Sequence, residues 1–148
     1  MRLTLHTDYG LRLLMHVALN QGQRCTIRDV SESFGISRNH LMKIASLLQQ
    51  QGYLLATRGK GGGLALARHA TLIHLGDLVC TLEPDMALAE CLGEANGCVV
   101  TSQCRLTGML VEARQAFIDS LNHYTLEDIC RPRQQALRLL LGIAVVSN

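Results

Sequence analysis

Aromatic residues are scarce: the chain has no tryptophan, two phenylalanines and three tyrosines among its 148 residues. Its hydrophobic fraction is nevertheless 48%, so the core has to be built from aliphatic side chains. Such a composition favours helices over an aromatic-rich β-sandwich. A chain of this length fits one domain, or a small domain together with an oligomerisation element.

Long apolar runs are also missing. The longest uncharged apolar run, residues 139–146, is eight residues long, and a membrane-spanning helix needs about 20. The first residues soon turn polar and lack the apolar region of a secretory signal. We therefore expect a cytoplasmic protein with no membrane role. In that compartment cysteines stay reduced, and they are better suited to ligating metal than to forming disulfides.

Several catalytic motifs are absent as well. The chain has no Cys-x-x-Cys pair, which argues against a structural zinc site. No histidine lies between His74 and His123, so the cysteines in that interval lack a histidine-bearing partner motif. The glycine-rich stretch 59–63 does not lead through Gly-Lys-Ser/Thr into a helix, as a phosphate-binding loop does. We do not expect an enzyme.

The charge is distributed unevenly along the chain. Residues 1–70 carry nine Lys/Arg and three Asp/Glu, whereas residues 71–148 carry five and nine, and the net charge is +2. A basic half beside an acidic half suggests that the first half meets a polyanion. The alternative is an ordinary solvated basic face.

The basic half shows a helix-turn-helix pattern. A first helix is predicted to follow Thr7 as its N-cap, with Asp8 at its positive end. A short capped helix should then end at Gly35, and a second should run over residues 38–51 until Gly52 stops it. Two short helices around a glycine-containing turn are typical of a DNA-binding motif.

The next segment, residues 53–67, is predicted to form two short strands around a glycine-rich turn, which corresponds to the wing of a winged helix. A recognition helix reaches base edges and phosphates with its N-terminal end, and glycines let a wing approach phosphates closely. Taken singly these residues are ordinary surface residues, and the wing could be a plain hairpin. The predicted DNA-contacting residues are Ser37, Arg38, Asn39, His40 and Lys43 on the helix and Arg58, Lys60, Gly62 and Gly63 on the wing.

The second half begins with a predicted helix over residues 75–82 and continues into a loop with three cysteines. A long helix should start after Cys104; its wide apolar face indicates a dimer seam or, equally well, burial in the core. Thr125 can cap a last short helix. The expected fold is mainly α. It comprises a winged helix-turn-helix DNA-binding domain (1–82), a loop expected to bind a metal cluster through its cysteines (83–104), and a dimerisation helix with C-terminal tail (105–148).

The three loop cysteines, Cys91, Cys98 and Cys104, are spaced Cys-x6-Cys-x5-Cys. Long, irregular spacing on a glycine-containing loop favours an iron–sulfur cluster over a single ion, with zinc, redox-active and inert thiols as alternatives. Three thiols leave one ligand to be found. Cys80 and Cys130 could supply it, but each lies in an apolar helical pattern where a thiol is usually core filler.

Taken in order over residues 1 to about 130, the chain resembles the winged-helix iron–sulfur regulators, a family that includes IscR. Within that family it is most similar to the nitric-oxide-sensing repressors. The IscR pattern has a histidine three residues after the last cysteine, where this chain has Thr107. The residues that carry the resemblance are 7–12, 37–44, 58–63, Gly76-Asp77, 82–84 and the three-cysteine loop.

The resemblance implies a homodimer that binds a palindromic double-stranded DNA operator. A [4Fe–4S] cluster, more than a [2Fe–2S] cluster, would be held by Cys91, Cys98 and Cys104 with Asp8 of the partner subunit. From the residues alone Asp8 is only a helix-dipole acid. The implied function is a repressor that releases DNA when nitric oxide nitrosylates the cluster. The alternatives are an iron–sulfur-status or redox-responsive regulator of the same fold and, from another class, a thiol-redox enzyme or zinc protein.

Overall fold

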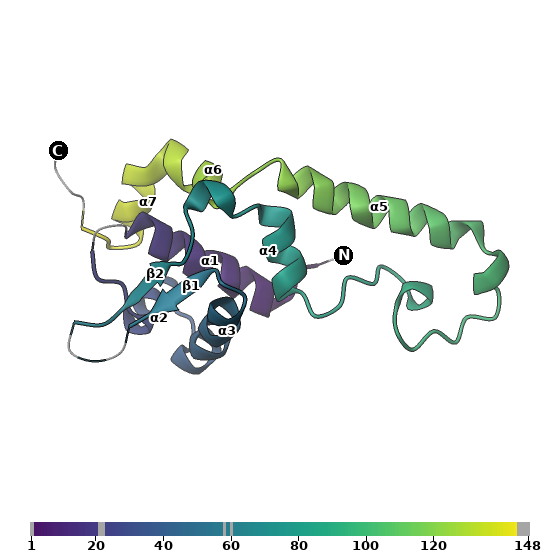
Figure 1. Cartoon of the computed structure of the whole chain (residues 1–148), viewed down its shortest axis with the longest axis horizontal. Coiled ribbons are helices and arrows are strands. Elements are labelled where there is room, and N and C mark those ends of the chain that lie inside the picture. The colour runs from purple at the N-terminus through teal and green to yellow at the C-terminus, as the bar shows by residue number, and fades with distance from the viewer. Residues whose placement is uncertain (1, 21–22, 58, 60, 145–148) are drawn as a thin grey trace.

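The computed structural model describes residues 2–20, 23–57, 59 and 61–144. The fold is mainly helical with one small sheet, as expected, and a long helix extends away from the rest of the molecule (Figure 1). The elements are α1 (Leu5–Leu19), α2 (Ile27–Phe34), α3 (Arg38–Gln50), β1 (Leu54–Ala56), β2 (Leu64–Leu66), η1 (Ala70–Leu72), α4 (Leu75–Leu82), η2 (Glu90–Leu92), η3 (Thr101–Gln103), α5 (Arg105–Asn122), α6 (Leu126–Cys130), η4 (Arg131–Arg133) and α7 (Gln134–Leu140).

Helix α1 lies at the centre of the core. It contacts α2, α3, α4, α6, α7 and strand β2, and most of the apolar residues in its second half are buried. The core is built almost entirely from aliphatic side chains, as the composition predicted, and α1 contributes Leu13, Leu14, Val17, Ala18 and Leu19. No helix among the described residues is long and apolar enough to cross a membrane.

The helix-turn-helix is confirmed. Thr26 caps α2 in a capping box: its hydroxyl accepts from the Asp29 N–H, and the Asp29 carboxylate accepts from the Thr26 N–H. Helix α2 ends at Gly35, and α3 follows from Arg38. The turn therefore sets α3 across α1, with Leu41 and Ile44 of α3 in the core.

The predicted start of α1 is wrong. The helix begins at Leu5, and its N-cap is Thr4, whose hydroxyl accepts from the Thr7 N–H. Thr7 itself is completely buried, and its hydroxyl donates to the Glu83 carboxylate at the end of α4. Glu83 also accepts from the Thr4 N–H. A residue 79 positions away in sequence therefore decides which threonine caps the helix, and local sequence patterns do not contain that information.

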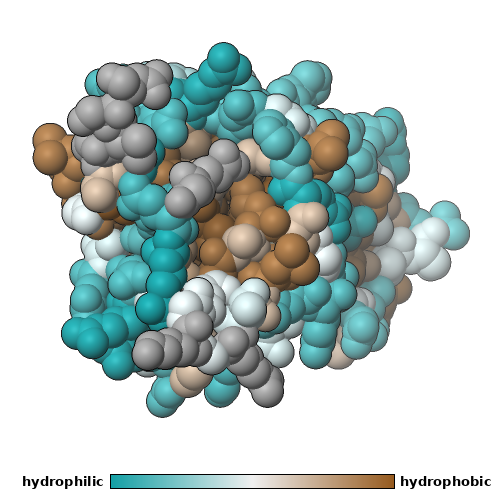
Figure 2. Space-filling model, turned by 60° about the vertical axis from the view of Figure 1, so that its left-hand side comes forward, coloured by the Kyte–Doolittle hydropathy of each residue, from teal (hydrophilic) through white to brown (hydrophobic). Residues whose placement is uncertain are grey.

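The wing is an antiparallel hairpin in which Leu54 pairs with Leu66 and Ala56 with Leu64. A pocket of about 400 Å³ lies between α1 and β2, with Val17 among its lining residues. Figure 2 turns the left-hand side of Figure 1 toward the viewer and shows hydrophobic residues in a central hollow, surrounded by hydrophilic residues. The small sheet thus covers one side of the aliphatic core without closing it completely.

The junction of α4 and α5 depends on a glycine. A Cβ on Gly76 would meet the Ile118 carbonyl and would lie 2.5 Å from Asn122 Oδ1. Next to it, Asn122 Oδ1 accepts from the Asp77 N–H at 2.9 Å, and Asn122 Nδ2 donates to the Asp77 carboxylate at 3.0 Å. Gly76-Asp77 therefore fixes the direction in which α5 leaves the core.

We predict that Gly76→Ala destabilises the protein by about 1–3 kcal/mol, because the new methyl group forces α4 and α5 apart. Urea unfolding followed by circular dichroism measures the loss. Ser120→Ala, at an exposed position on α5, is the control. If both variants lose the same stability, α4 and α5 do not approach as closely as described.

After α5 the chain returns to the core. Helices α6 and α7 both contact α1, and Thr125 caps α6 in a second capping box, as predicted for that threonine. The tail beyond Pro132, whose structure the sequence left open, includes α7. The three-part division into 1–82, 83–104 and 105–148 stays a prediction; the contacts add that residues 126–144 pack on the first part.

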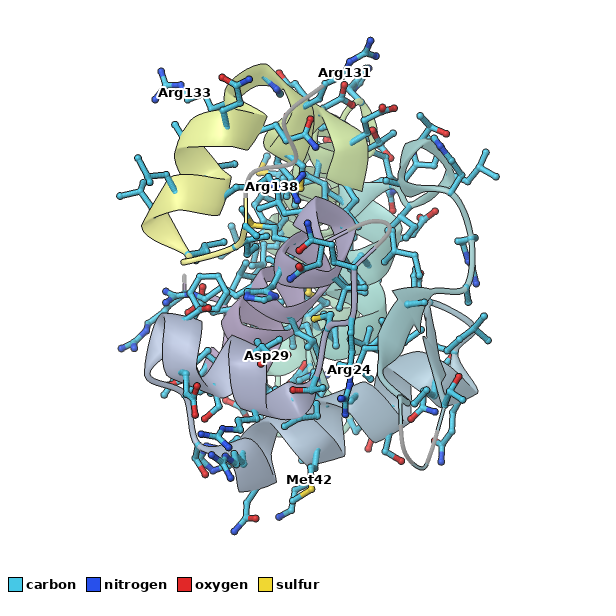
Figure 3. The ribbon with its side chains drawn as sticks, turned by 90° about the vertical axis from the view of Figure 1, so that its left-hand side faces the viewer. Arg24, Asp29, Met42, Arg131, Arg133 and Arg138 are labelled. Atoms are coloured by element: carbon cyan, nitrogen blue, oxygen red, sulfur yellow. The ribbon has the colours of Figure 1, made fainter. Side chains whose placement is uncertain are left out.

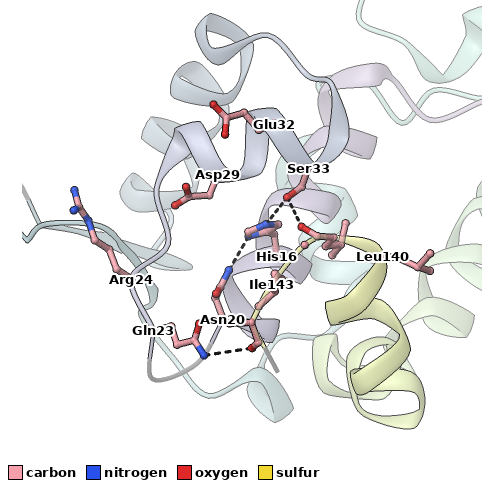
Figure 4. Close-up of a pocket in the computed structure, with 12 residues that line it drawn as sticks. His16, Asn20, Gln23, Arg24, Asp29, Glu32, Ser33, Leu140 and Ile143 are labelled. Carbon is pink, nitrogen blue, oxygen red and sulfur yellow. Dashed lines mark hydrogen bonds between the residues drawn. The ribbon is translucent and has the colours of Figure 1, made fainter. Parts of the chain in front are cut away.

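A buried polar network joins this C-terminal segment to α1 and α2 (Figure 4). Ser33 Oγ donates to the Leu141 carbonyl at 2.8 Å, so it accepts from His16 Nε2, 3.0 Å away. His16 Nδ1 is then the acceptor for the Asn20 amide at 3.1 Å. The network satisfies a neutral imidazole. Burial lowers the pKa of His16 below its ordinary 6.5, and Asp29 opposes only part of this shift.

We predict that acid weakens the fold through His16. The pKa of His16 is lower in the folded protein than in the unfolded chain. As the pH falls below about 6.5, the unfolded chain therefore binds a proton at His16 before the folded protein does. This lowers the free energy of unfolding by up to about 1.4 kcal/mol per pH unit. Urea unfolding at pH 7.5 and 5.5 should show a smaller pH-dependent loss for His16→Gln than for wild type. The control variant His123→Gln, at an exposed position, should lose as much stability between the two pH values as wild type. If His16→Gln also loses as much as wild type, His16 is not the source of the acid sensitivity.

Candidate functional site

The DNA-reading residues predicted for α3 are all exposed at the N-terminal end of this helix. Its inward stripe, Leu41, Ile44, Ala45 and Leu48, is buried, and this forces the other positions outward. Near the N-terminal end of the helix the exposed residues are Ser37, Arg38, Asn39, His40, Met42 and Lys43. All five residues predicted for this helix are therefore exposed at its N-terminal end, together with Met42, which the sequence reading had omitted.

Two of these residues are positioned by neighbours. Arg38 lies 3.6 Å from the Glu32 carboxylate, which also pairs with Arg28 at 2.6 Å. The His40 ring lies 6.4 Å from the ring of Tyr9 on α1. Such exposed ion pairs are worth little in stability, but they set the starting positions of the side chains. Tyr9 is therefore a residue of the site that the sequence reading missed, because only the packing of α1 on α3 reveals it.

The wing differs in part from its prediction. Gly59 and Gly61 have φ of 96° and 91°, which only glycine adopts easily, so the turn requires them. Gly62 is buried, and its carbonyl accepts from Arg24 at 2.7 Å; a Cβ on Gly63 would lie 2.7 Å from the Cys25 carbonyl. These two glycines hold the wing to the preceding segment, and their contact with DNA stays a prediction. Arg58 and Lys60 lie outside the described residues.

The segment that carries the three cysteines, between α4 and α5, extends to the N-terminal end of α5 and away from α3 (Figure 1). Cys91 is in η2, Cys98 is exposed, and Cys104 is the N-cap residue of α5; all three thiols are free. Among the described residues no three His, Cys, Asp or Glu side chains converge as metal ligands. One chain alone thus supplies three thiols on one loop but does not gather them.

The pKa of Cys104 differs in direction from those of the buried thiols Cys25 and Cys130. The Cys104 pKa is lowered, first by the backbone N–H of Thr107 and then by the Thr107 hydroxyl and the Leu106 N–H, because these donors favour the thiolate. Burial raises the pKa of Cys25 to about 12 and that of Cys130 to about 11. These two are core thiols, as expected for Cys130. The expectation that Cys80 is core filler is wrong, because it is exposed.

Polar side chains shape the loop between the first two cysteines. Glu90 Oε1 accepts from the Gly97 N–H at 3.0 Å, which ties the start of the loop to its tip. Asn96 Oδ1 accepts from the Cys98 N–H at 3.0 Å, and the Thr101 hydroxyl donates to the Cys98 carbonyl at 2.9 Å. The Asn96-Gly97 pair is a known turn signal, but the role of Glu90 was not visible in the sequence.

Asp8 lies in the first turn of α1. Both Asp8 oxygens pair with Arg12, one turn later, at 2.8 and 3.1 Å, and the Asp8 side chain remains 39% exposed. The Arg12 guanidinium in turn lies 5.8 Å from the centre of the Phe34 ring on α2. Asp8 therefore remains accessible to another subunit and is connected, through one side chain, to the helix-turn-helix.

This arrangement defines a winged-helix DNA-binding regulator. The chain matches the family model of Rrf2, an iron-dependent transcriptional regulator, over residues 3–132. The chain belongs to the Rrf2 family of transcriptional regulators. The resemblance found in the sequence is thus confirmed at the level of the family.

Solved structures agree. IscR of T. potens superposes with a TM-score of 0.73 at 20% identity, covering 92% of this chain and 90% of that chain. The oxidized form of Staphylococcus aureus CymR superposes with a TM-score of 0.69 at 26% identity, covering 88% of this chain and 97% of that chain. B. subtilis CymR, described as a global cysteine regulator, superposes with a TM-score of 0.67 at 22% identity, covering 87% of this chain and 95% of that chain. The first and third likenesses support the fold.

We predict that Glu90→Ala loosens the cysteine loop. The Gly97 N–H loses its acceptor, so its hydrogen exchange should quicken about two- to ten-fold, the value of one hydrogen bond. Exchange followed by mass spectrometry on peptides covering residues 94–100 measures it. Glu94→Ala, which removes an exposed carboxylate from the same loop, should leave the exchange unchanged. Equal exchange in Glu90→Ala and wild type would contradict the hydrogen bond between the Gly97 N–H and the Glu90 carboxylate.

Proposed function

We propose that the chain is a nitric-oxide-responsive repressor of the NsrR type. It would bind a palindromic double-stranded operator as a homodimer, with residues 1–82 on DNA, 83–104 holding an iron–sulfur cluster and 105–148 including the dimerisation helix. Cys91, Cys98 and Cys104 of one subunit and Asp8 of the partner subunit would hold a [4Fe–4S] cluster. Regulators of the Rrf2 family bind DNA and are dimeric, which supports the coarser part of this proposal.

The donor set fits such a cluster. Thiolates are the usual ligands of iron–sulfur clusters, and the lowered pKa of Cys104 favours the form that binds iron. Three thiols leave a fourth position to a residue outside the loop. The exposed carboxylate of Asp8 is a harder ligand and holds iron more weakly than a thiolate.

The exposed apolar side chains of helix α5 support the proposed dimer. None of its 18 residues is buried, and its apolar side chains Leu106, Met109 and Val111 are 57%, 54% and 40% exposed. An amphipathic helix gains its stability by burying its apolar face, and among the described elements α5 packs mainly on α4, with fewer contacts to η2. A second α5 is the partner that these faces match best.

The observation that carries the proposal is the position of Asp8. Its neighbour Tyr9 lies against His40 of α3, and its ion-pair partner Arg12 lies against Phe34 of α2. A bond from Asp8 to the partner subunit would therefore fix both helices of the DNA-reading unit relative to the dimer. Loss of that bond would return Asp8 to Arg12 and free the unit to move.

When bound, the cluster would supply irons that react with nitric oxide. What the chain contributes is the coupling between Asp8 and the spacing of the two recognition helices. A coupling of about 1–3 kcal/mol changes operator affinity about 5- to 150-fold, and about 5.5 kcal/mol would move the equilibrium from 99:1 to 1:99. The required energy is therefore within reach of one ligand bond and the contacts beside it.

We predict that Asp8→Ala uncouples DNA binding from nitric oxide. Air-free wild-type protein should show an iron–sulfur absorption band and lose operator affinity about 5- to 150-fold on treatment with the gas. The variant should show less than a three-fold change in fluorescence anisotropy titrations. Glu127→Ala, which removes another carboxylate paired with an arginine one turn later, should behave as wild type.

Two outcomes would contradict this proposal. If Asp8→Ala binds and releases the operator as wild type does, Asp8 is not the coupling residue. If the wild type carries a [2Fe–2S] cluster and ignores nitric oxide, the regulator responds instead to iron–sulfur status or redox state. Iron and sulfide counts on the same air-free sample separate the two cluster types.

A further inference from the structure

Met42 is an apolar residue among polar residues on the exposed surface of α3. Helix α3, which the structure describes throughout, exposes one large apolar side chain, Met42, at 52%. It points away from the body of the protein at the end of the molecule formed by α3, opposite Arg131 and Arg133 (Figure 3). It contributes nothing to the core, whose α3 residues are Leu41, Ile44, Ala45 and Leu48.

The position of Met42 within the helix is informative. Asn39, Met42, Lys43 and Ser46 are spaced by three and four residues and are all exposed, so they form the outward stripe of α3. Single exposed apolar residues are common on protein surfaces. This one lies in the middle of the stripe, one turn after Asn39 and next to Lys43, where a recognition helix faces the bases.

The major groove offers one kind of apolar group to such a side chain. Of the four bases only thymine carries a methyl group on its major-groove edge; the other features are hydrogen-bond donors and acceptors. The methionine thioether is flexible and polarisable, and it can follow an apolar contact that a branched side chain would miss. It can satisfy no donor or acceptor of a base strongly.

We propose that Met42 is a specificity-determining residue that contacts the C5-methyl group of a thymine in each operator half-site. This inference rests on the DNA binding proposed above, but neither on the cluster nor on nitric oxide. Asn39, one turn earlier, and Lys43 would then contact the neighbouring base edge and phosphate. Each half-site should contain a thymine whose methyl group, and not only its pairing, is required.

The test removes that methyl group without changing base pairing. Tight-binding duplexes are first selected from a random DNA library with the full-length, air-free protein. Each thymine of one half-site is then replaced in turn by deoxyuridine, and affinity is measured by fluorescence anisotropy. At one position wild type should lose about four-fold, the value of one buried methyl group. Met42→Ala should bind more weakly and be insensitive to deoxyuridine at that position.

Two further variants sharpen the result. Met42→Leu keeps an apolar contact and should keep part of the sensitivity. Leu139→Ala, which truncates a 76% exposed leucine on α7, should retain the full wild-type profile. The proposal is overturned if Met42→Ala keeps the wild-type profile or if no thymine methyl matters to wild type, while DNA binding stands. If the selection yields no specific duplex, the proposed function fails as well.

Discussion

The packing of α1 against α3 is the constraint on which the rest of the molecule depends. One face of α1 supplies the largest share of the aliphatic core, and its first turns carry Asp8, Tyr9 and Arg12 beside the two helices of the DNA-reading motif. On the buried face of α1, the helix approaches α4 closely: a Cβ on Gly10 would lie 2.5 Å from Leu82 Cδ1. Because packed interiors do not deform continuously, a force applied to the start of α1 reaches α3 as a movement of whole elements.

Polar contacts hold the remaining pieces to this helix. His16 connects α1 to α2 and to the C-terminal segment through Ser33, and Arg24 and Cys25 connect the same region to the wing. A buried polar group is costly unless it is paired, so the contacts of His16, which is 1% exposed, admit few alternative arrangements. The wing, the recognition helix and the chain's last described residues consequently form one unit with α1.

The cysteine loop and α5 have the opposite character. Residues 94–100 are all exposed, including Val99 at 95%, and α5 buries none of its residues within the chain. Polar contacts such as that between Glu90 and Gly97 give the loop a shape, but no core stands behind it. A compact DNA-reading unit joined to an open, apolar arm is the physical basis for proposing that the second subunit completes the site.

The sequence by itself determined most of the local structure: the helix-turn-helix, the hairpin of the wing, the stop at Gly35, the cap at Thr125 and the exposed side of α3. These features depend on residues within one or two turns of each other, so periodicity and capping rules reach them. Tertiary structure decided what depends on distant neighbours. It made Thr4 the cap of α1 because Glu83 engages Thr7, exposed Cys80, built α7 against α1, and placed Tyr9 and Arg12 between Asp8 and the reading helices. No local pattern records which side chain lies opposite another across a core.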